Sequence, residues 1–187
     1  LILGERPHTV YAALSEAAAQ NCVVCTAPSK TFNLAGLQTA NIIVPNEALR
    51  ERLPEVRRRV GIHGCNMLGY RACETAYRQC EDWLEQLLTV LRENRALVET
   101  YARAFLPGVK PVALEGTYLQ WLDCRGLGSE AKALEKFMQE EALWFTDEGY
   151  IFGTGGEGFE RINLACPTWV LRKALDRLRD ALVRRKS

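Results

Sequence analysis

The sequence predicts an α/β fold followed by a smaller α+β unit. Two short apolar runs, Cys22–Thr26 and Ala40–Val44, are each stopped by a proline and have the length of strands. They flank a polar, turn-rich segment, a pattern typical of buried strands in an α/β sheet. Residues 96–187 then mix strand-like and helical patterns. We therefore expect two buried strands first and a separate α+β unit last.

Helical spacing dominates the region between these parts. Pro45-Asn46-Glu47 offers an N-cap and an acidic first turn. Further on, apolar residues recur at intervals of three and four positions, which indicates one face of a helix. These residues are Ala76, Cys80, Trp83, Leu84, Leu87, Leu88 and Leu91. We expect one long helix here that joins two domains.

The C-terminal part alternates strands with helices. Val109–Val112 and Thr117–Leu122 are strand-like, and a third strand, Phe159–Leu164, follows a glycine-rich loop. A helix between them is expected to begin at Ser129 as N-cap, with Leu134, Phe137 and Met138 on one face. The last helix is expected to turn five residues inward: Leu171, Ala174, Leu175, Leu178 and Leu182.

Composition excludes several classes of protein. The net charge of the 187-residue chain is +1, so we expect no nucleic-acid partner. No apolar run approaches the ~20 residues of a membrane span, so we expect no membrane partner. Cys22 and Cys25 could form a redox or metal pair, but no second pair completes a zinc site. We interpret them as small buried residues of a strand, expect no metal, and take the seven cysteines to suit a reducing cytoplasm.

Lys30 is the first residue that could carry chemistry. It lies just past the first strand, in a loop of small and polar residues. A lysine held near a strand end can lose solvent, which frees its amine as a nucleophile for an aldehyde. A loop lysine that is solvated and inert is the alternative.

Arg161 is the second residue that could carry chemistry. It alternates with Ile162 and Leu164 in the strand after the glycines, so it points away from the apolar face. A planar guanidinium fixed there could bind a carboxylate through two parallel hydrogen bonds. The alternative is an ordinary exposed strand arginine.

Three segments in order resemble one known family. Residues 26–38 (TAPSKTFNLAGLQ) resemble the lysine motif of the MalY/PatB family, residues 115–123 (EGTYLQWLD) its small-domain strand, and residues 158–167 (GFERINLACP) its carboxylate-arginine motif. The members of that family are pyridoxal 5′-phosphate (PLP) enzymes that cleave carbon–sulfur bonds and share the aminotransferase class I/II fold.

The resemblance implies a fold, domains and residue roles. The chain would be the C-terminal part of a fold-type I enzyme: residues 1–64 the remainder of the large-domain sheet, 65–95 a connecting helix, and 96–187 the small domain. Lys30 would form a Schiff base with PLP and act as the catalytic base. Ser29 would help to hold the cofactor phosphate, and Arg161 would bind the carboxylate of an amino-acid substrate.

The implied reaction is β-elimination from cystathionine or a related cysteine S-conjugate, giving pyruvate, ammonia and a thiol, in a cytoplasmic homodimer. Ala27 and Gln38 replace a glycine or serine and an arginine of the general aminotransferase pattern, which favours the lyase branch. An aminotransferase and a non-catalytic binding or regulatory module remain alternatives. The chain opens on an apolar run without Met, so we expect a fragment that lacks the N-terminal half and does not turn over substrate alone.

Overall fold

The computed structural model describes residues 1–186 and divides the chain into two compact units. The N-terminal unit is Pro7–Gln86, and the C-terminal unit is Leu1–Arg6 together with the residues from Leu87 onward. The domain boundaries at 64 and 95 stay a prediction. Within the described residues, none of the helices has the length and apolar character needed to cross a membrane.

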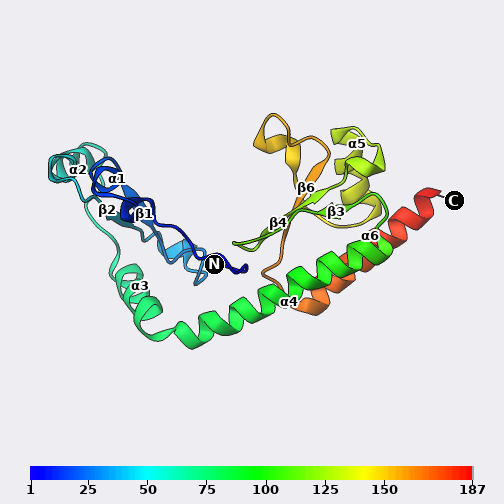
Figure 1. Ribbon diagram of the computed structural model, residues 1–187, viewed down its shortest axis with the longest axis horizontal. Helices are drawn as coiled ribbons and strands as arrows, with labels where there is room; N and C mark the ends of the chain where they lie inside the picture. The colour runs from blue at the N-terminus through cyan, green and yellow to red at the C-terminus, as the bar shows by residue number, and fades with distance from the viewer. Residues whose placement is uncertain (187) are drawn as a thin grey trace. The chain divides into compact units, whose positions relative to one another are not determined.

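The helices and strands follow one another in groups along the chain (Figure 1). The helices are α1 (Glu16–Gln20), α2 (Glu47–Arg59), α3 (Met67–Gln79), α4 (Glu81–Phe105), α5 (Ala131–Lys136) and α6 (Thr168–Lys186). The strands are β1 (Val24–Thr26), β2 (Asn41–Ile43), β3 (Lys110–Pro111), β4 (Leu119–Asp123), β5 (Asp147–Glu148) and β6 (Phe159–Asn163).

In the N-terminal unit, β1 and β2 form an antiparallel pair in which Cys25 lies opposite Ile42. The prediction that these strands are buried is wrong for this chain. Val23, Ile42 and Ile43 are each about half exposed, and Cys25 is exposed as well. Two strands of three residues bury little apolar surface without a further layer against them. The strand positions themselves are confirmed to within two residues.

The predicted continuous helix is interrupted at Cys80, between α3 and α4. Cys80 leaves the helical conformation (φ −113°, ψ 27°), and its carbonyl oxygen accepts the N–H of Leu84 at 3.1 Å, the first hydrogen bond of α4. Glu81 and Asp82 place two negative charges on the first turn of α4, where they favour a helix N-terminus. The expected cap of α2 is confirmed, because the side chain of Asn46 accepts the N–H of Leu49.

The C-terminal unit is built on a four-stranded antiparallel sheet with strand order β3-β4-β6-β5. Burial alternates strictly along β4 and β6, so the sheet has two distinct faces. The buried face carries Gln120, Leu122, Glu160 and Ile162. The opposite face, here called the outer face, carries Trp121, Asp123, Phe159 and Arg161. The odd-numbered side chains of these strands are therefore available for contacts outside the core.

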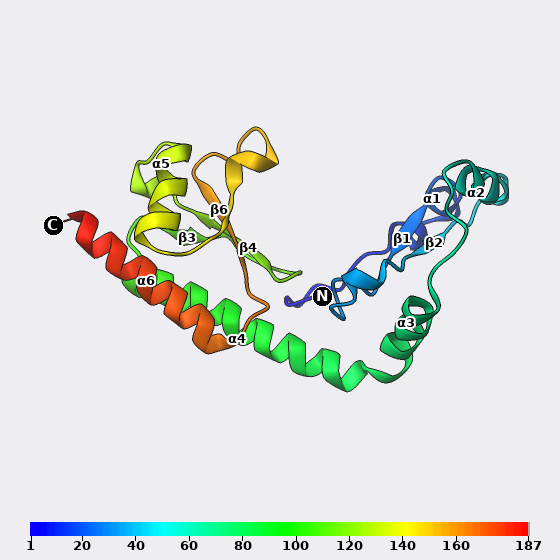
Figure 2. The ribbon, with the colours of Figure 1, turned by 180° about the vertical axis from the view of Figure 1, so that it is seen from behind.

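Two long helices complete this unit. The second half of α4 lies alongside α6 in both views (Figure 1, Figure 2). Asn94 of α4 joins them to the end of the sheet, because its amide nitrogen donates to the carbonyl oxygens of Leu164 (2.8 Å) and Cys166 (2.9 Å). The inward residues predicted for α6 are buried, except Ala174, which is partly buried.

The predicted N-cap at Ser129 is wrong. The N-cap residue of α5 is Glu130, and it makes no capping hydrogen bond through its side chain. The Ser129 hydroxyl accepts instead from the Arg185 guanidinium of α6 at 2.9 Å. A tertiary contact has thus taken the hydroxyl that a local cap would use. Leu134, Phe137 and Met138 are buried as predicted, although Phe137 and Met138 lie in the helical turn Phe137–Glu141 that follows α5.

Candidate active site

The loop that carries Lys30 is wound tightly after β1. The carbonyl oxygen of Pro28 accepts the N–H of Phe32 at 2.9 Å, and that of Ser29 accepts the N–H of Leu34 at 3.0 Å. Pro28 is buried, Ser29 is partly buried, and Lys30 is exposed at the outside of this turn. The backbone therefore presents the lysine side chain outward. The sequence led us to expect that this lysine loses solvent, but the described residues leave it exposed.

Aromatic contacts anchor this loop to the helices that follow. The Phe32 ring meets the Tyr77 ring of α3 edge to face, with centroids 5.8 Å apart, and lies 6.0 Å from the Trp83 ring of α4. Such pairs add to the stabilisation that comes from burial alone. Since Phe32 is only two positions from Lys30, these contacts limit how far the lysine backbone can move.

Lys30 and Ser29 are both free to bind a further group. Lys30 is the one lysine in residues 1–109 of the sequence. Within residues 1–186, neither its amine nor the Ser29 hydroxyl has a hydrogen-bond or ion-pair partner. An unpaired amine can attack an aldehyde as a nucleophile, and a neighbouring hydroxyl can donate a hydrogen bond to an anionic substituent of that aldehyde.

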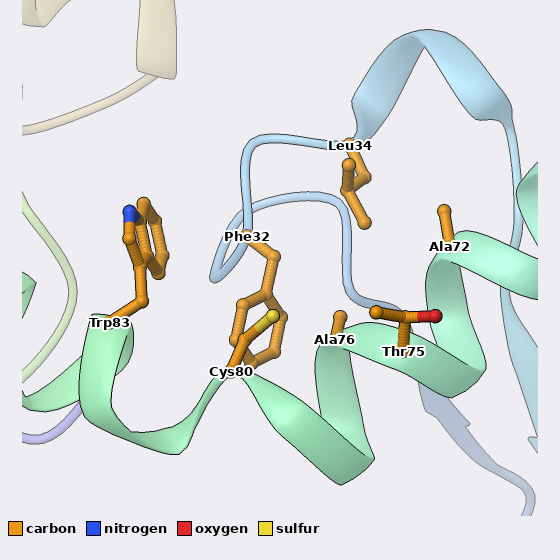
Figure 3. Close-up of a pocket in the computed structure, with 7 residues that line it drawn as sticks. All are labelled: Phe32, Leu34, Ala72, Thr75, Ala76, Cys80 and Trp83. Carbon is orange, nitrogen blue, oxygen red and sulfur yellow. The ribbon is translucent and has the colours of Figure 1, made fainter.

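A pocket of about 300 Å³ lies between the lysine loop and the helices (Figure 3). Its lining combines two loop residues with five from α3, the Cys80 break and α4: Phe32, Leu34, Ala72, Thr75, Ala76, Cys80 and Trp83. Nothing in this lining is charged, so the pocket suits an apolar group and not a phosphate. Sequence reasoning missed it, because its walls come from segments about forty residues apart.

Arg161 lies on the outer face of the sheet in the C-terminal unit, as its alternation with Ile162 predicted. Its Nε and Nη2 atoms donate to Oδ2 of Asp147 at 3.1 and 2.7 Å. The guanidinium carbon lies 4.4 Å from the centre of the Phe152 ring, a cation–π distance. Its side chain is 26% exposed, so the group is held in place and still reachable.

Aromatic rings extend along the outer face from Arg161. Trp121 lies opposite Arg161 on β4, and its ring packs 5.3 Å from Phe152 and 6.0 Å from Phe159. A cavity of about 330 Å³ opens here, lined by these three rings, Val112 and the loop 153–156. The sequence motif containing Trp121 indicated a strand, but only the sheet register brings its ring beside Phe152.

The buried face of the same strand carries an unusual acid, Glu160. Its side chain is 1% exposed and accepts the Thr146 hydroxyl at 2.5 Å. Burial, together with the nearby carboxylates of Glu148, Glu135 and Asp147, raises the pKa of Glu160 to about 7, against the lowering effect of the Thr146 hydrogen bond. Sequence reasoning missed this residue, although its position between Phe159 and Arg161 on an alternating strand pointed inward.

This fold and these motifs define a class of protein. The family model for aminotransferase class I and II matches residues 3–178, so the chain belongs to that family. The resemblance drawn from the three motifs and the predicted fold class are thereby confirmed.

The chain is similar to several individual proteins. The chain is 36% identical to cystathionine β-lyase PatB of Bacillus subtilis (strain 168) over 97% of this chain, and 31% identical to protein MalY of Escherichia coli (strain K12), also over 97%. Among solved structures it superposes on cystalysin from Treponema denticola, which contains a pyridoxal 5′-phosphate cofactor, with a TM-score of 0.95 and 44% identity over 98% of the chain.

The chain spans about half the length of these relatives. It covers 47% of PatB, 46% of MalY and 47% of cystalysin. The similarity therefore concerns one half of each relative, the half that contains the counterparts of the lysine loop and of the sheet with Arg161.

Proposed function

We propose that the full-length natural protein is a PLP-dependent carbon–sulfur β-lyase. Its substrate would be cystathionine or a related cysteine S-conjugate, which reacts with one water to give pyruvate, ammonia and a thiol. The observation that carries the proposal is the 36% identity to cystathionine β-lyase PatB across 97% of this chain. The free amine of Lys30, in the loop that follows β1, supports it.

The residues present fit the cofactor. Lys30 offers an amine without a partner, which can attack an aldehyde as a nucleophile, and Ser29 offers an adjacent hydroxyl, which can donate a hydrogen bond to a phosphate. Lys30 would attach the cofactor, and Ser29 would donate one hydrogen bond to its phosphate. PLP, when bound, supplies an electron sink that stabilises negative charge on the substrate Cα.

Lys30 would also carry the proton transfer. An amine close to the substrate Cα takes its proton as a general base. Loss of that proton allows the bond between Cβ and sulfur to break, and the electron pair leaves with the thiolate. An aminotransferase would instead return the proton at another carbon, so the position of reprotonation separates the two activities.

Arg161 would orient the substrate. Asp147 occupies the edge of its guanidinium formed by Nε and Nη2, and within residues 1–186 no hydrogen bond involves Nη1. The edge formed by Nη1 and the second hydrogen of Nη2 can therefore take a carboxylate with two parallel hydrogen bonds. A substrate α-carboxylate bound there would be fixed in both position and plane.

Product analysis of the full-length protein tests the lyase proposal. With PLP and cystathionine, pyruvate and homocysteine are the expected products. A keto acid that keeps the sulfur chain would identify an aminotransferase and overturn the proposal. The same question arises from the 28% identity to LL-diaminopimelate aminotransferase of Desulforudis audaxviator over 83% of this chain.

Two lysine variants test the cofactor assignment. Lys30→Ala is expected to remove the absorbance band that PLP gives near the edge of the visible range. Lys173→Ala, which changes an exposed lysine of α6, is the matched control and is expected to keep the band. No band in the wild-type protein would contradict the enzyme proposal and favour a binding module.

Assembly and location belong to the same proposal. We propose a cytoplasmic location, because seven cysteines in a chain of this length suit a reducing compartment. We also propose a homodimer, which the family resemblance implies. Sedimentation of the full-length protein at micromolar concentration tests the dimer, and a monomer at all concentrations would contradict it.

A further inference from the structure

The guanidinium of Arg161 is held along one edge by a carboxylate and covered on one face by an aromatic ring. Both hydrogen bonds from it reach a single oxygen, Oδ2 of Asp147, at 3.1 Å from Nε and 2.7 Å from Nη2. The Phe152 ring covers one side of the guanidinium plane at 4.4 Å. An anion on one edge and a ring on one face together determine both the direction and the plane of the opposite edge.

One short segment supplies both contacts. Asp147 belongs to β5 and lies directly opposite Arg161 in the β5–β6 pairing. Phe152 ends the helical turn Gly149–Phe152 that follows β5 without a break. The segment 147–152 therefore delivers the carboxylate and the ring as one piece.

Close backbone packing and a side-chain hydrogen bond restrict this segment. Gly149 approaches Gly156 so closely that a Cβ on Gly149 would lie 2.0 Å from the Gly156 carbonyl oxygen. The Tyr150 hydroxyl donates to Glu135 of α5 at 2.9 Å. With both sides of the turn fixed, Asp147 and Phe152 present a preformed clamp to Arg161.

We propose that Asp147 is a positioning residue that orients Arg161 for the α-carboxylate of the substrate. The proposal rests on the proposed function, in which Arg161 binds that carboxylate. Asp147 touches no substrate atom. It holds the Nε–Nη2 edge so that the Nη1–Nη2 edge is aimed before substrate arrives, which lowers the cost of ordering a long side chain on binding.

Loss of the ion pair between Asp147 and Arg161 should affect folding stability and substrate binding to different extents. The Asp147 side chain is 50% exposed, and exposed ion pairs contribute little to folding. Loss of the pair should therefore leave the thermal stability almost unchanged. Misplacement of a group that binds the substrate by about 1 Å, in contrast, can cost a large factor in binding or rate.

The outer face contains a matched control pair. Arg125 donates from Nε to Oδ1 of Asp123 at 2.9 Å and from Nη2 to Oδ2 at 2.7 Å. Its guanidinium lies 4.8 Å from the centre of the Phe159 ring. This pair repeats the chemistry of Asp147, Arg161 and Phe152, but Arg125 has no proposed substrate role.

Kinetics of the full-length enzyme with cystathionine provide the test, with propionate as a carboxylate probe that lacks an amino group. Asp147→Ala is expected to raise KM and the propionate inhibition constant roughly tenfold, with a smaller change in kcat. Asp147→Asn keeps an oxygen acceptor at the same place and should stay within about twofold of wild type. Asp123→Ala should leave all three quantities unchanged.

Arginine side-chain NMR gives a readout that does not depend on turnover. The Nε–H signal of Arg161 is expected to broaden and shift in Asp147→Ala, and to remain in place in Asp123→Ala. If Asp147→Ala fails to fold, Asp147→Ser serves in its place, because its short hydroxyl cannot reach the guanidinium.

The outcomes separate this proposal from the proposed function. An unchanged or lower KM and inhibition constant in Asp147→Ala, while Arg161→Ala raises both, would overturn the positioning role alone. If Arg161→Ala leaves both unchanged, the carboxylate role of Arg161 is wrong and the positioning role fails with it. Loss of stability in Asp147→Ala with unchanged binding would show a merely structural pair.

Discussion

Replacing Glu160 by glutamine tests whether the buried face of the four-stranded sheet holds a protonated acid. The carboxyl group is almost fully buried and accepts one hydroxyl, from Thr146. Its pKa is raised from an ordinary value of 4.5 to about 7, mainly by burial. Glutamine has the same shape as the protonated acid and does not titrate, so it removes the pH dependence and little else.

Whether stability rises or falls with pH depends on which state of the protein, folded or unfolded, binds the Glu160 proton more tightly. The folded state keeps the Glu160 proton up to about pH 7, whereas the unfolded chain loses it near pH 4.5. The stability that this proton contributes is thus fully present below pH 4.5 and is lost as the pH rises to about 7. At 1.36 kcal/mol per pKa unit, the difference corresponds to about 3 kcal/mol.

Urea unfolding at a series of pH values measures this effect. Between pH 4.5 and 8, the free energy of unfolding of Glu160→Gln is expected to gain about 3 kcal/mol relative to wild type. Glu140→Gln, a change at an exposed position of the same unit, should follow the wild-type profile. Parallel profiles for wild type and Glu160→Gln would refute the reasoning, because they would mean that Glu160 ionises at its ordinary pH.

Three further changes test the packing of the chain. Leu122→Ala, at a fully buried position of β4, should lower the free energy of unfolding by about 2–5 kcal/mol in a denaturant titration. Gly149→Ala places a Cβ 2.0 Å from the Gly156 carbonyl oxygen and should cost about 3 kcal/mol or more, measured as a fall in Tm. Iodoacetamide at pH 8 should modify exposed Cys25 rapidly. Burial raises the pKa of Cys124 to about 12 and should protect its thiol until the protein unfolds. Peptide mass spectrometry measures the labelling of both residues.

Each change has a control within the chain. Val183→Ala, at an exposed position of α6, should alter stability far less than Leu122→Ala. Gly64→Ala meets no atom within 4 Å and should be tolerated, so equal losses in both glycine variants would contradict the clash. Cys65 is exposed and Cys73 is buried, and labelling that ignores this difference would contradict the burial pattern.

Local patterns predicted the elements well where a local interaction decides them. The Asn46 cap, the strands around the lysine loop and the inward face of α6 all depend on residues a few positions apart. The prediction at Ser129 was wrong for the opposite reason, because Arg185, fifty-six positions away, takes its hydroxyl. The predicted continuous helix was wrong for a different reason: a new helix N-terminus starts after Cys80 within an unbroken apolar pattern.

The sequence alone determined the family, the positions of the three motifs and the outward direction of Arg161, because motif order and strand alternation are properties of consecutive residues. Only the tertiary structure decided what surrounds the two key side chains. The β5–β6 register brings Asp147 and Phe152 to Arg161, and the turn after β1 presents Lys30 outward. Such contacts depend on which strands pair and in what register, and that choice is made by the burial of the whole sheet, not by any short segment of it.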